Sequence, residues 1–172
     1  SQGNKGVAFL FKKNKVTTIE GWGRLAGNGK VEVEKDGKKA TYSAKHIVLA
    51  TGSRPRSLPM LEIDGDRVWS SDQAVFAPEA PKSIAIIGAG AIGMEFADVF
   101  SAFGSQVTII EALDQVLPLE DKDSAQVVER SYKKRGMTIY TSARVEKADV
   151  GKKSVKLTFK DKAGKDQTIE VD

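Results

Sequence analysis

The sequence predicts an α/β fold in which a doubly wound parallel sheet is accompanied by an antiparallel three-stranded meander. A short apolar run at residues 84–87 ends in glycines and is followed by a helical pattern, as in a buried parallel strand leading into a helix. Apolar runs at 107–110 and 137–140 repeat this alternation. Three strand-like segments then follow one another across short turns, at residues 143–150, 154–160 and 167–171.

The stretch from Ser83 to Glu111 carries the clearest motif. Its glycines have the G-x-G-x-x-G spacing directly after the first apolar run. Gly88 permits a tight turn, Gly90 leaves room for a diphosphate beside the backbone, and Gly93 allows close packing of helix on strand. Free N–H groups and the positive end of the helix dipole favour an anion there. We therefore expect a Rossmann-like dinucleotide site formed by Gly88, Ala89, Gly90, Ala91, Ile92 and Gly93.

Glu111 ends the second apolar run, 23 residues beyond Gly88. An acid about 20 residues after the first glycine binds the ribose hydroxyls of the nucleotide in this type of site. A carboxylate also repels a 2′-phosphate, so this residue favours NAD over NADP. Two alternatives stay open: a glycine turn without a ligand, and FAD in place of NAD, because both dinucleotides use this motif.

The first part of the chain predicts a different kind of structure. A helix ends near Lys13, and apolar runs at 16–19 and 46–50 read as strands. Between them lies a small antiparallel meander, with hairpin turns at Asn28-Gly29 and Asp36-Gly37. Gly21-Trp22-Gly23 is expected to form a turn or bulge, or to approach a ligand.

A connector is predicted over residues 57–81, because this segment contains Pro59, Pro78 and Pro81 and no sustained periodicity. We place the domain boundary at its end, which gives domains at 1–81 and 82–172. Ser71 or Asp72 is the expected cap of a short helix in the connector. Asp121 is the expected cap of a longer helix over residues 122–135.

The composition favours a globular protein and argues against several other classes. The chain has 27 Lys and Arg against 23 Asp and Glu, a net charge of +4, and no basic stripe with interleaved aromatics, so nucleic-acid binding is unsupported. No apolar run is long enough to span a membrane. The absence of cysteine excludes a disulfide scaffold, a thiolate metal site and a thiol nucleophile in this chain. No metal site is expected.

Taken in order, the motifs resemble the middle of a pyridine nucleotide–disulfide oxidoreductase, a family of flavoproteins with two dinucleotide sites. The residues that carry the resemblance include Leu10 to Val16, Gly21 to Gly23, Ala50 to Pro55, Ile86 to Phe96, Phe103 to Ser105, Glu111, Leu117-Pro118 and Asp121. The resemblance spans the whole chain but corresponds to about a third of a family member. It is strongest to the branch that oxidises dihydrolipoyl groups.

The resemblance implies a parent enzyme that passes electrons from a dithiol through a redox-active disulfide and FAD to NAD⁺. It also implies a homodimer that serves 2-oxo acid dehydrogenase complexes in the cytoplasm, or in the mitochondrial matrix of a eukaryote. The alternatives are mercuric or glutathione reductase, or a non-catalytic nucleotide-binding domain. Residues 112–115 contain no arginine for the phosphate of NADP, as a glutathione reductase would require.

Further site residues follow from the resemblance. Glu95 would point toward the nicotinamide carboxamide, although the residue pattern alone favours an exposed helix position, and Val145 would lie beside the adenine. The residues that would approach FAD are Gly23, Thr51, Gly52 and Ser53. The first FAD motif, the cysteine pair and the C-terminal domain have no counterpart in this sequence. The isolated chain is therefore expected to bind FAD poorly, and it contributes no catalytic residue.

Overall fold

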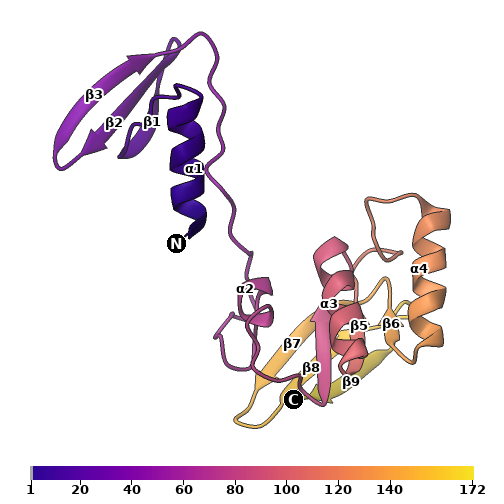
Figure 1. Cartoon of the computed structure of the whole chain (residues 1–172). Helices are drawn as coiled ribbons and strands as arrows, with labels where there is room; N and C mark the ends of the chain where they lie inside the picture. The colour runs from indigo at the N-terminus through magenta and orange to yellow at the C-terminus, as the bar shows by residue number, and fades with distance from the viewer. Residues whose placement is uncertain (1) are drawn as a thin grey trace. The chain divides into compact units, whose positions relative to one another are not determined.

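The computed structural model describes residues 2–172, which form two compact units. One unit lies within the first 53 residues, and the other extends from Arg54 to Asp172. Figure 1 shows the helices and strands of both units and labels most of them.

The first unit consists of one helix and one antiparallel sheet. Helix α1 spans Gln2–Lys13, and the sheet has the order β1-β2-β3, with strands at Trp22–Gly27, Lys30–Lys35 and Lys38–Ser43 (Figure 1). Both predicted hairpin turns are confirmed. Asn28 and Gly29 have φ angles of 49° and 68°, and Asp36 and Gly37 have 51° and 73°, as type I′ turns require.

The strands predicted at 16–19 and 46–50 are wrong, because both segments are irregular. An apolar run becomes a strand only where a neighbouring strand pairs with its backbone. No strand described in the first unit pairs its backbone with either segment. Residues 17–20 instead line an open groove with Lys35 and Tyr42. Lys35 Nζ donates a hydrogen bond of 2.5 Å to Glu20 Oε2, which lowers the pKa of Glu20.

Within residues 21–23, Gly21 is the residue whose backbone lies closest to a neighbouring strand. Its φ is 143°, and a Cβ at this position would lie 2.6 Å from the carbonyl oxygen of Glu34. Trp22 and Gly23 belong to β1 rather than to a turn. Gly21 therefore serves the packing of the sheet itself.

The second unit is built around a parallel sheet with the order β4-β5-β6 (Figure 1). Its strands lie at Ser83–Ile87, Gln106–Ile110 and Thr138–Tyr140. Helices α3 (Ala91–Ala102) and α4 (Lys122–Lys134) connect them. These elements confirm the predicted βαβ alternation. Asp121 caps α4 as predicted, because its side chain accepts hydrogen bonds from the N–H groups of Asp123 and Ser124.

An antiparallel meander covers the other face of the parallel sheet. It comprises β7 (Arg144–Val150), β8 (Val155–Lys160) and β9 (Asp166–Val171), which confirms the predicted order. Neighbouring residues of β5 point to opposite faces, so Ile109 packs with α3 and α4 whereas Ile110 packs with the meander. The second unit thus has a helical layer, a central sheet and a second sheet.

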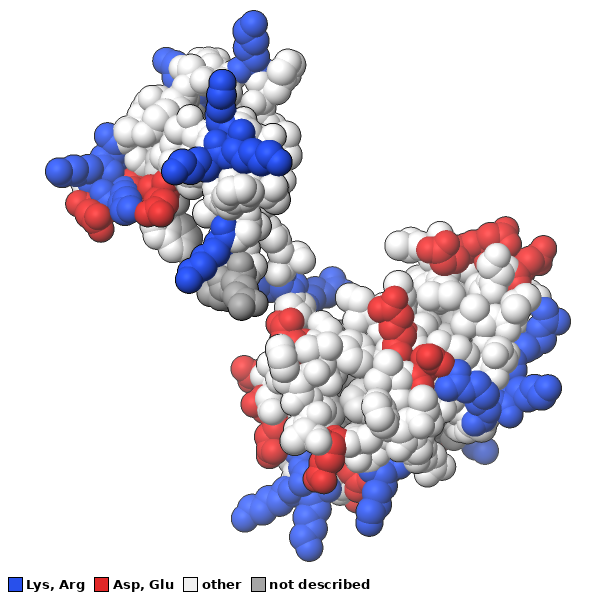
Figure 2. Space-filling model, in the orientation of Figure 1, with Lys and Arg blue, Asp and Glu red and all other residues white. Residues whose placement is uncertain are grey.

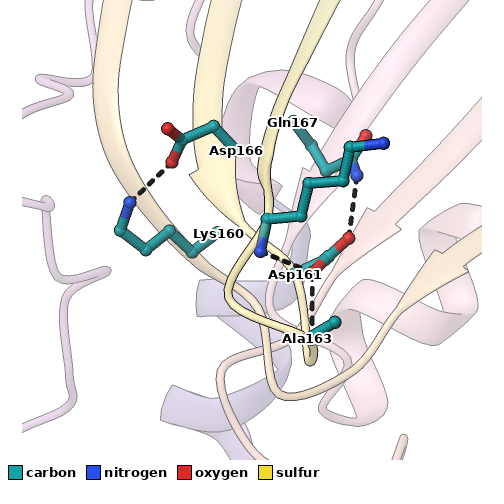
Figure 3. A network of polar contacts seen from close by, with 6 residues as sticks. Lys160, Asp161, Ala163, Asp166 and Gln167 are labelled. Carbon is teal, nitrogen blue, oxygen red and sulfur yellow. Dashed lines mark hydrogen bonds and ion pairs between the residues drawn. The ribbon is translucent and has the colours of Figure 1, made fainter.

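The turn between β8 and β9 is fixed by one carboxylate (Figure 3). Asp161 Oδ1 accepts hydrogen bonds from the N–H groups of Ala163 and Lys165 at 2.9 and 3.0 Å. Its Oδ2 accepts one from Gln167 Nε2 at 2.8 Å, and Lys160 and Asp166 form an ion pair of 2.6 Å nearby. These hydrogen bonds, the one from the Lys165 N–H first, lower the pKa of Asp161.

The connector packs onto the second unit. Arg67 donates hydrogen bonds of 2.9 Å to the carbonyl oxygens of Asp172 and Lys152. Trp69 packs against Phe100 of α3, with ring centroids 6.4 Å apart. The compact units therefore divide between Ser53 and Arg54. The domain boundary expected after Pro81 stays a prediction about the longer protein.

The short helix α2 (Ser71–Ala74) lies within the connector, but its cap differs from the prediction. Ser70, rather than Ser71 or Asp72, is the N-cap. Ser70 accepts from the N–H of Asp72, and Gln73 accepts from the N–H of Ser70. This reciprocal arrangement is a capping box, and its cap lies one residue before Ser71 and two before Asp72, the two expected caps.

Candidate dinucleotide site

The turn from β4 to α3 has the geometry that its glycines predict. Gly88 has a φ of 103°, and its N–H donates to the carbonyl oxygen of Ile110 at 2.9 Å. A Cβ on Gly93 would lie 2.1 Å from the carbonyl oxygen of Gly88, so the helix packs directly on the turn. The chain itself therefore requires glycine at both positions.

Gly90 differs from these two glycines because the fold does not require it. Its φ and ψ of −70° and 178° are open to any residue, and a Cβ there would meet no atom within 4 Å. Gly90 is the N-cap of α3 and offers no capping side chain. Within residues 2–172, no N–H group from Gly90 to Gly93 has a protein acceptor. Unbonded donors thus lie beside open space at the positive end of a helix.

Glu111 faces this turn from the end of β5. Its side chain is buried, and Oε2 accepts a hydrogen bond of 2.6 Å from the N–H of Ala89. Oε1 accepts one of 2.8 Å from the N–H of Leu113. The expectation of bare amides along the whole turn is therefore wrong at Gly88 and Ala89, whose N–H groups are already bound by Ile110 and Glu111. A carboxylate has about four acceptor positions, so capacity for ribose hydroxyls is left.

The second helix of the unit holds α3 in place. Tyr132 of α4 donates a hydrogen bond of 3.0 Å from its hydroxyl to the carbonyl oxygen of Met94, in the second turn of α3. Burial of the Tyr132 hydroxyl raises its pKa. Because α3 begins at the glycine turn, this contact helps to fix the direction of the free amides.

A family model described as pyridine nucleotide-disulphide oxidoreductase matches residues 1–172. The chain belongs to this family. "Dihydrolipoyl dehydrogenase 3" of Pseudomonas putida is 43% identical over 161 residues, which are 93% of this chain and 34% of that protein. The chain thus spans about a third of the length of the relatives that it matches.

Solved structures of the family confirm the fold. The crystal structure of LpdA from Mycobacterium tuberculosis has a TM-score of 0.79 at 28% identity, covering 97% of this chain and 37% of that one. The water-forming NADH oxidase of Lactobacillus brevis, solved with NADH bound, has a TM-score of 0.59 at 30% identity. That match covers 84% of this chain and 33% of the oxidase.

The other nucleotide-site residues expected from the family lie in two settings. Ala91, Ile92 and Glu95 are exposed on the first turns of α3, close in sequence to the free amides. Val145 is buried in the layer between the two sheets, where it is paired with Phe159. The roles of these residues toward NAD stay predictions.

The residues expected to approach FAD belong to the first unit. Thr51, Gly52 and Ser53 are exposed and irregular, and Gly52 has a φ of 79°. Gly23 lies in β1, where a Cβ would meet only Val31 at 3.8 Å. There is space for a ligand beside Gly23, and the FAD contacts of these residues stay predictions.

Sequence reasoning missed the loop after β5 as part of the site. The N–H of Leu117 donates a hydrogen bond of 2.7 Å to the carbonyl oxygen of Ala89. The only sequence signal was the Leu117-Pro118 pair, which carried the family resemblance without indicating a contact. The site therefore includes a loop segment as well as the β4–α3 turn.

Charge and metal-binding groups give no second site. Figure 2 shows mostly Lys and Arg side chains on the visible face of the first unit, and groups of both Lys or Arg and Asp or Glu on that of the second. Among residues 2–172, no three His, Cys, Asp or Glu side chains gather as metal ligands would. The same residues include no helix with the length and apolarity needed to cross a membrane.

Proposed function

We propose that the β4–α3 turn and Glu111 bind the diphosphate and the adenosine ribose of NAD(H). The observation that carries this proposal is the row of unbonded amides from Gly90 to Gly93 beside the open space at Gly90. A diphosphate would accept hydrogen bonds from these amides at the positive end of α3. Glu111 would accept hydrogen bonds from the ribose hydroxyls, while Glu95 and Val145 would lie near the nicotinamide and the adenine.

For the longer protein we propose dihydrolipoyl dehydrogenase activity, the name carried by the Pseudomonas putida relative. The dithiol would lose two electrons and two protons, and NAD⁺ would accept a hydride while one proton is released. FAD would supply the redox carrier between a disulfide and NAD⁺. In this chain Gly23, Thr51, Gly52 and Ser53 would approach FAD, and no residue here is assigned a catalytic role.

The same proposal includes the partners of the longer protein. It would form a homodimer and serve 2-oxo acid dehydrogenase complexes, in the cytoplasm or in a mitochondrial matrix. The relative's name favours this branch of the family over mercuric or glutathione reductase.

The test is a titration of the 172-residue chain with NADH and with NADPH, in which the fluorescence of the nucleotide reports binding. We expect NADH to bind more tightly than NADPH, because the carboxylate of Glu111 repels the 2′-phosphate. The Gly90→Ala variant should weaken NADH binding about tenfold or more, equivalent to about 1.4 kcal/mol. Its unfolding midpoint should stay unchanged, since the added methyl group meets no protein atom.

Gly6→Ala is the matched control, because a Cβ at Gly6 also meets no atom within 4 Å and Gly6 lies in the other unit. Glu111→Gln should reduce the ratio between the dissociation constants for NADPH and NADH, because the amide carries no negative charge. The proposal is wrong if NADPH binds the unaltered chain as tightly as NADH, or if Gly90→Ala binds NADH normally.

A further inference from the structure

Ala89, the residue between the first two glycines of the motif, is held at both of its backbone groups. It is fully buried. Its N–H donates to Glu111 Oε2 at 2.6 Å, and its carbonyl oxygen accepts from the N–H of Leu117 at 2.7 Å. Ala89, which directly precedes the free amides, is thus held by Glu111 on one side and by Leu117 on the other, and both lie more than 20 residues further along the chain.

Leu117 makes its contact from an unusual backbone conformation. Its φ is 47°, in the left-handed region that bulky residues seldom adopt. A residue in such a conformation persists only where its surroundings determine it, and such residues gather at functional sites.

The neighbours of Leu117 hold it in this conformation. Val116 is fully buried in the core that contains α3, and the side chain of Leu117 packs against that same core. The carbonyl oxygen of Leu117 accepts from the N–H of Glu120 at 2.9 Å. Gln115 Nε2 donates to the carbonyl oxygen of Glu120 at 3.1 Å. These bonds close the loop on itself, and the N–H of Leu117 is directed at the carbonyl oxygen of Ala89.

The consequence for the nucleotide site follows from chain connectivity. Ala89 directly precedes Gly90, the first of the four amides without a protein acceptor. A rotation of the Ala89 peptide would turn these donors away from a common point. An anion site is strongest when its donors are directed before the ligand arrives.

We propose that Leu117 is a positioning residue for the diphosphate of NAD(H). Its left-handed backbone holds the carbonyl of Ala89 and thereby sets the direction of the amides from Gly90 to Gly93. This inference depends on the proposed function, because it concerns the same site.

Two substitutions separate the backbone role from a packing role. Leu117→Val keeps the N–H and an apolar side chain, but a β-branched residue resists positive φ. Leu117→Gly loses the side chain but adopts positive φ freely. If the backbone conformation matters, the valine variant should bind NADH less well than the glycine variant. If only side-chain packing matters, the order should be reversed.

The experiment measures dissociation constants of the full 172-residue chain for NADH, ADP-ribose and adenosine. In Leu117→Val we expect NADH and ADP-ribose to bind about tenfold more weakly, a change of about 1.4 kcal/mol. Adenosine lacks the diphosphate, so its binding should change less than about twofold. Leu119→Val is the control, because it is the same substitution at a nearby leucine that is 95% exposed.

Circular dichroism checks that each variant is folded. Should Leu117→Val not fold, Leu117→Ala replaces it, since alanine and glycine both lack the packing group and differ in their tolerance of positive φ. Equal NADH binding by the valine or alanine variant and the unaltered chain would overturn this inference alone. Equal weakening of adenosine and NADH would also overturn it. Failure of the unaltered chain to bind NADH or ADP-ribose would overturn the proposed function and, with it, this inference.

Discussion

The two units of the chain contain similar apolar runs but bury them to very different extents. In the second unit, Ile109 and Ile110 of β5 are almost fully buried between layers. In the first unit, Val48 and Leu49 are 87% and 66% exposed, and no residue from 3 to 53 is buried. The comparison teaches that an apolar run forms a strand where the fold supplies a pairing edge, and becomes buried where the fold also supplies a covering layer.

The largest expected difference between the units is in hydrogen exchange of their backbone amides. We expect amides of β5 and β8 to exchange only through opening of the whole second unit, which costs about 5–15 kcal/mol in ordinary domains. Amides of residues 17–20 and 46–50, which lie outside any strand, should exchange at nearly the rate of an unfolded chain. Mass spectrometry of peptides from the intact chain measures both. Slow exchange at 46–50 would show that the strand predicted there exists in solution.

The next largest difference between the units is expected in how much the truncation of an aromatic side chain lowers the free energy of unfolding. Phe159 is fully buried, and its ring meets that of Tyr140 edge-on at 4.9 Å. Phe159→Ala should lower the free energy of unfolding by about 3–5 kcal/mol. Trp22→Ala in the first unit should change the free energy of unfolding of that unit by less than about 0.5 kcal/mol, because Trp22 is 85% exposed.

Urea unfolding followed by circular dichroism measures these changes. Phe76→Ala is the control within the second unit, since Phe76 is 84% exposed. A loss at Phe76 as large as that at Phe159 would contradict the assignment of the core.

The smallest expected effect is a pH dependence of the second unit. Asp64 accepts hydrogen bonds from the N–H groups of Val68, Asp66 and Arg67, and these bonds lower its pKa. Because the folded pKa lies below the unfolded one, the stabilisation is complete well above about pH 4 and is lost as the pH falls through the folded pKa. The urea midpoint should therefore decrease below about pH 4.

Asp64→Asn tests the origin of this decrease. An asparagine oxygen can still accept the backbone hydrogen bonds but carries no titrating proton, so the decrease in midpoint at low pH should be smaller. An unchanged pH profile in this variant would assign the effect to other carboxylates, such as Asp161.

Much of the second unit could be predicted because its signals are local. The apolar runs and the Asp121 cap placed β4, β5 and α4 within one or two residues of their observed bounds, and the glycines indicated the helix α3 that follows them. The strands predicted at 16–19 and 46–50 failed because pairing depends on segments elsewhere in a fold. Local signals also misplaced the α2 cap by one or two residues, since several adjacent polar residues can serve as caps.

The sequence predicted only part of the candidate site, for a related reason. The spacing predicted that Glu111 ends a strand near the glycines, but not that its two oxygens bind Ala89 and Leu113. The positive φ of Leu117 had no signal in residue preference, because leucine rarely adopts it. Val116 and Leu117 both pack into the core that contains α3, and such packing emerges only in three dimensions.

Each unit contains one of the two tryptophans of the chain, and their surroundings differ. The Trp22 ring is already in water, whereas Trp69 packs against Phe100 and donates from Nε1 to the carbonyl oxygen of Asp66 at 2.9 Å. On denaturation the emission of Trp22 should barely move, while that of Trp69 should shift toward longer wavelength. Intrinsic fluorescence of an unlabelled sample therefore reports selectively on the unit that holds the nucleotide turn.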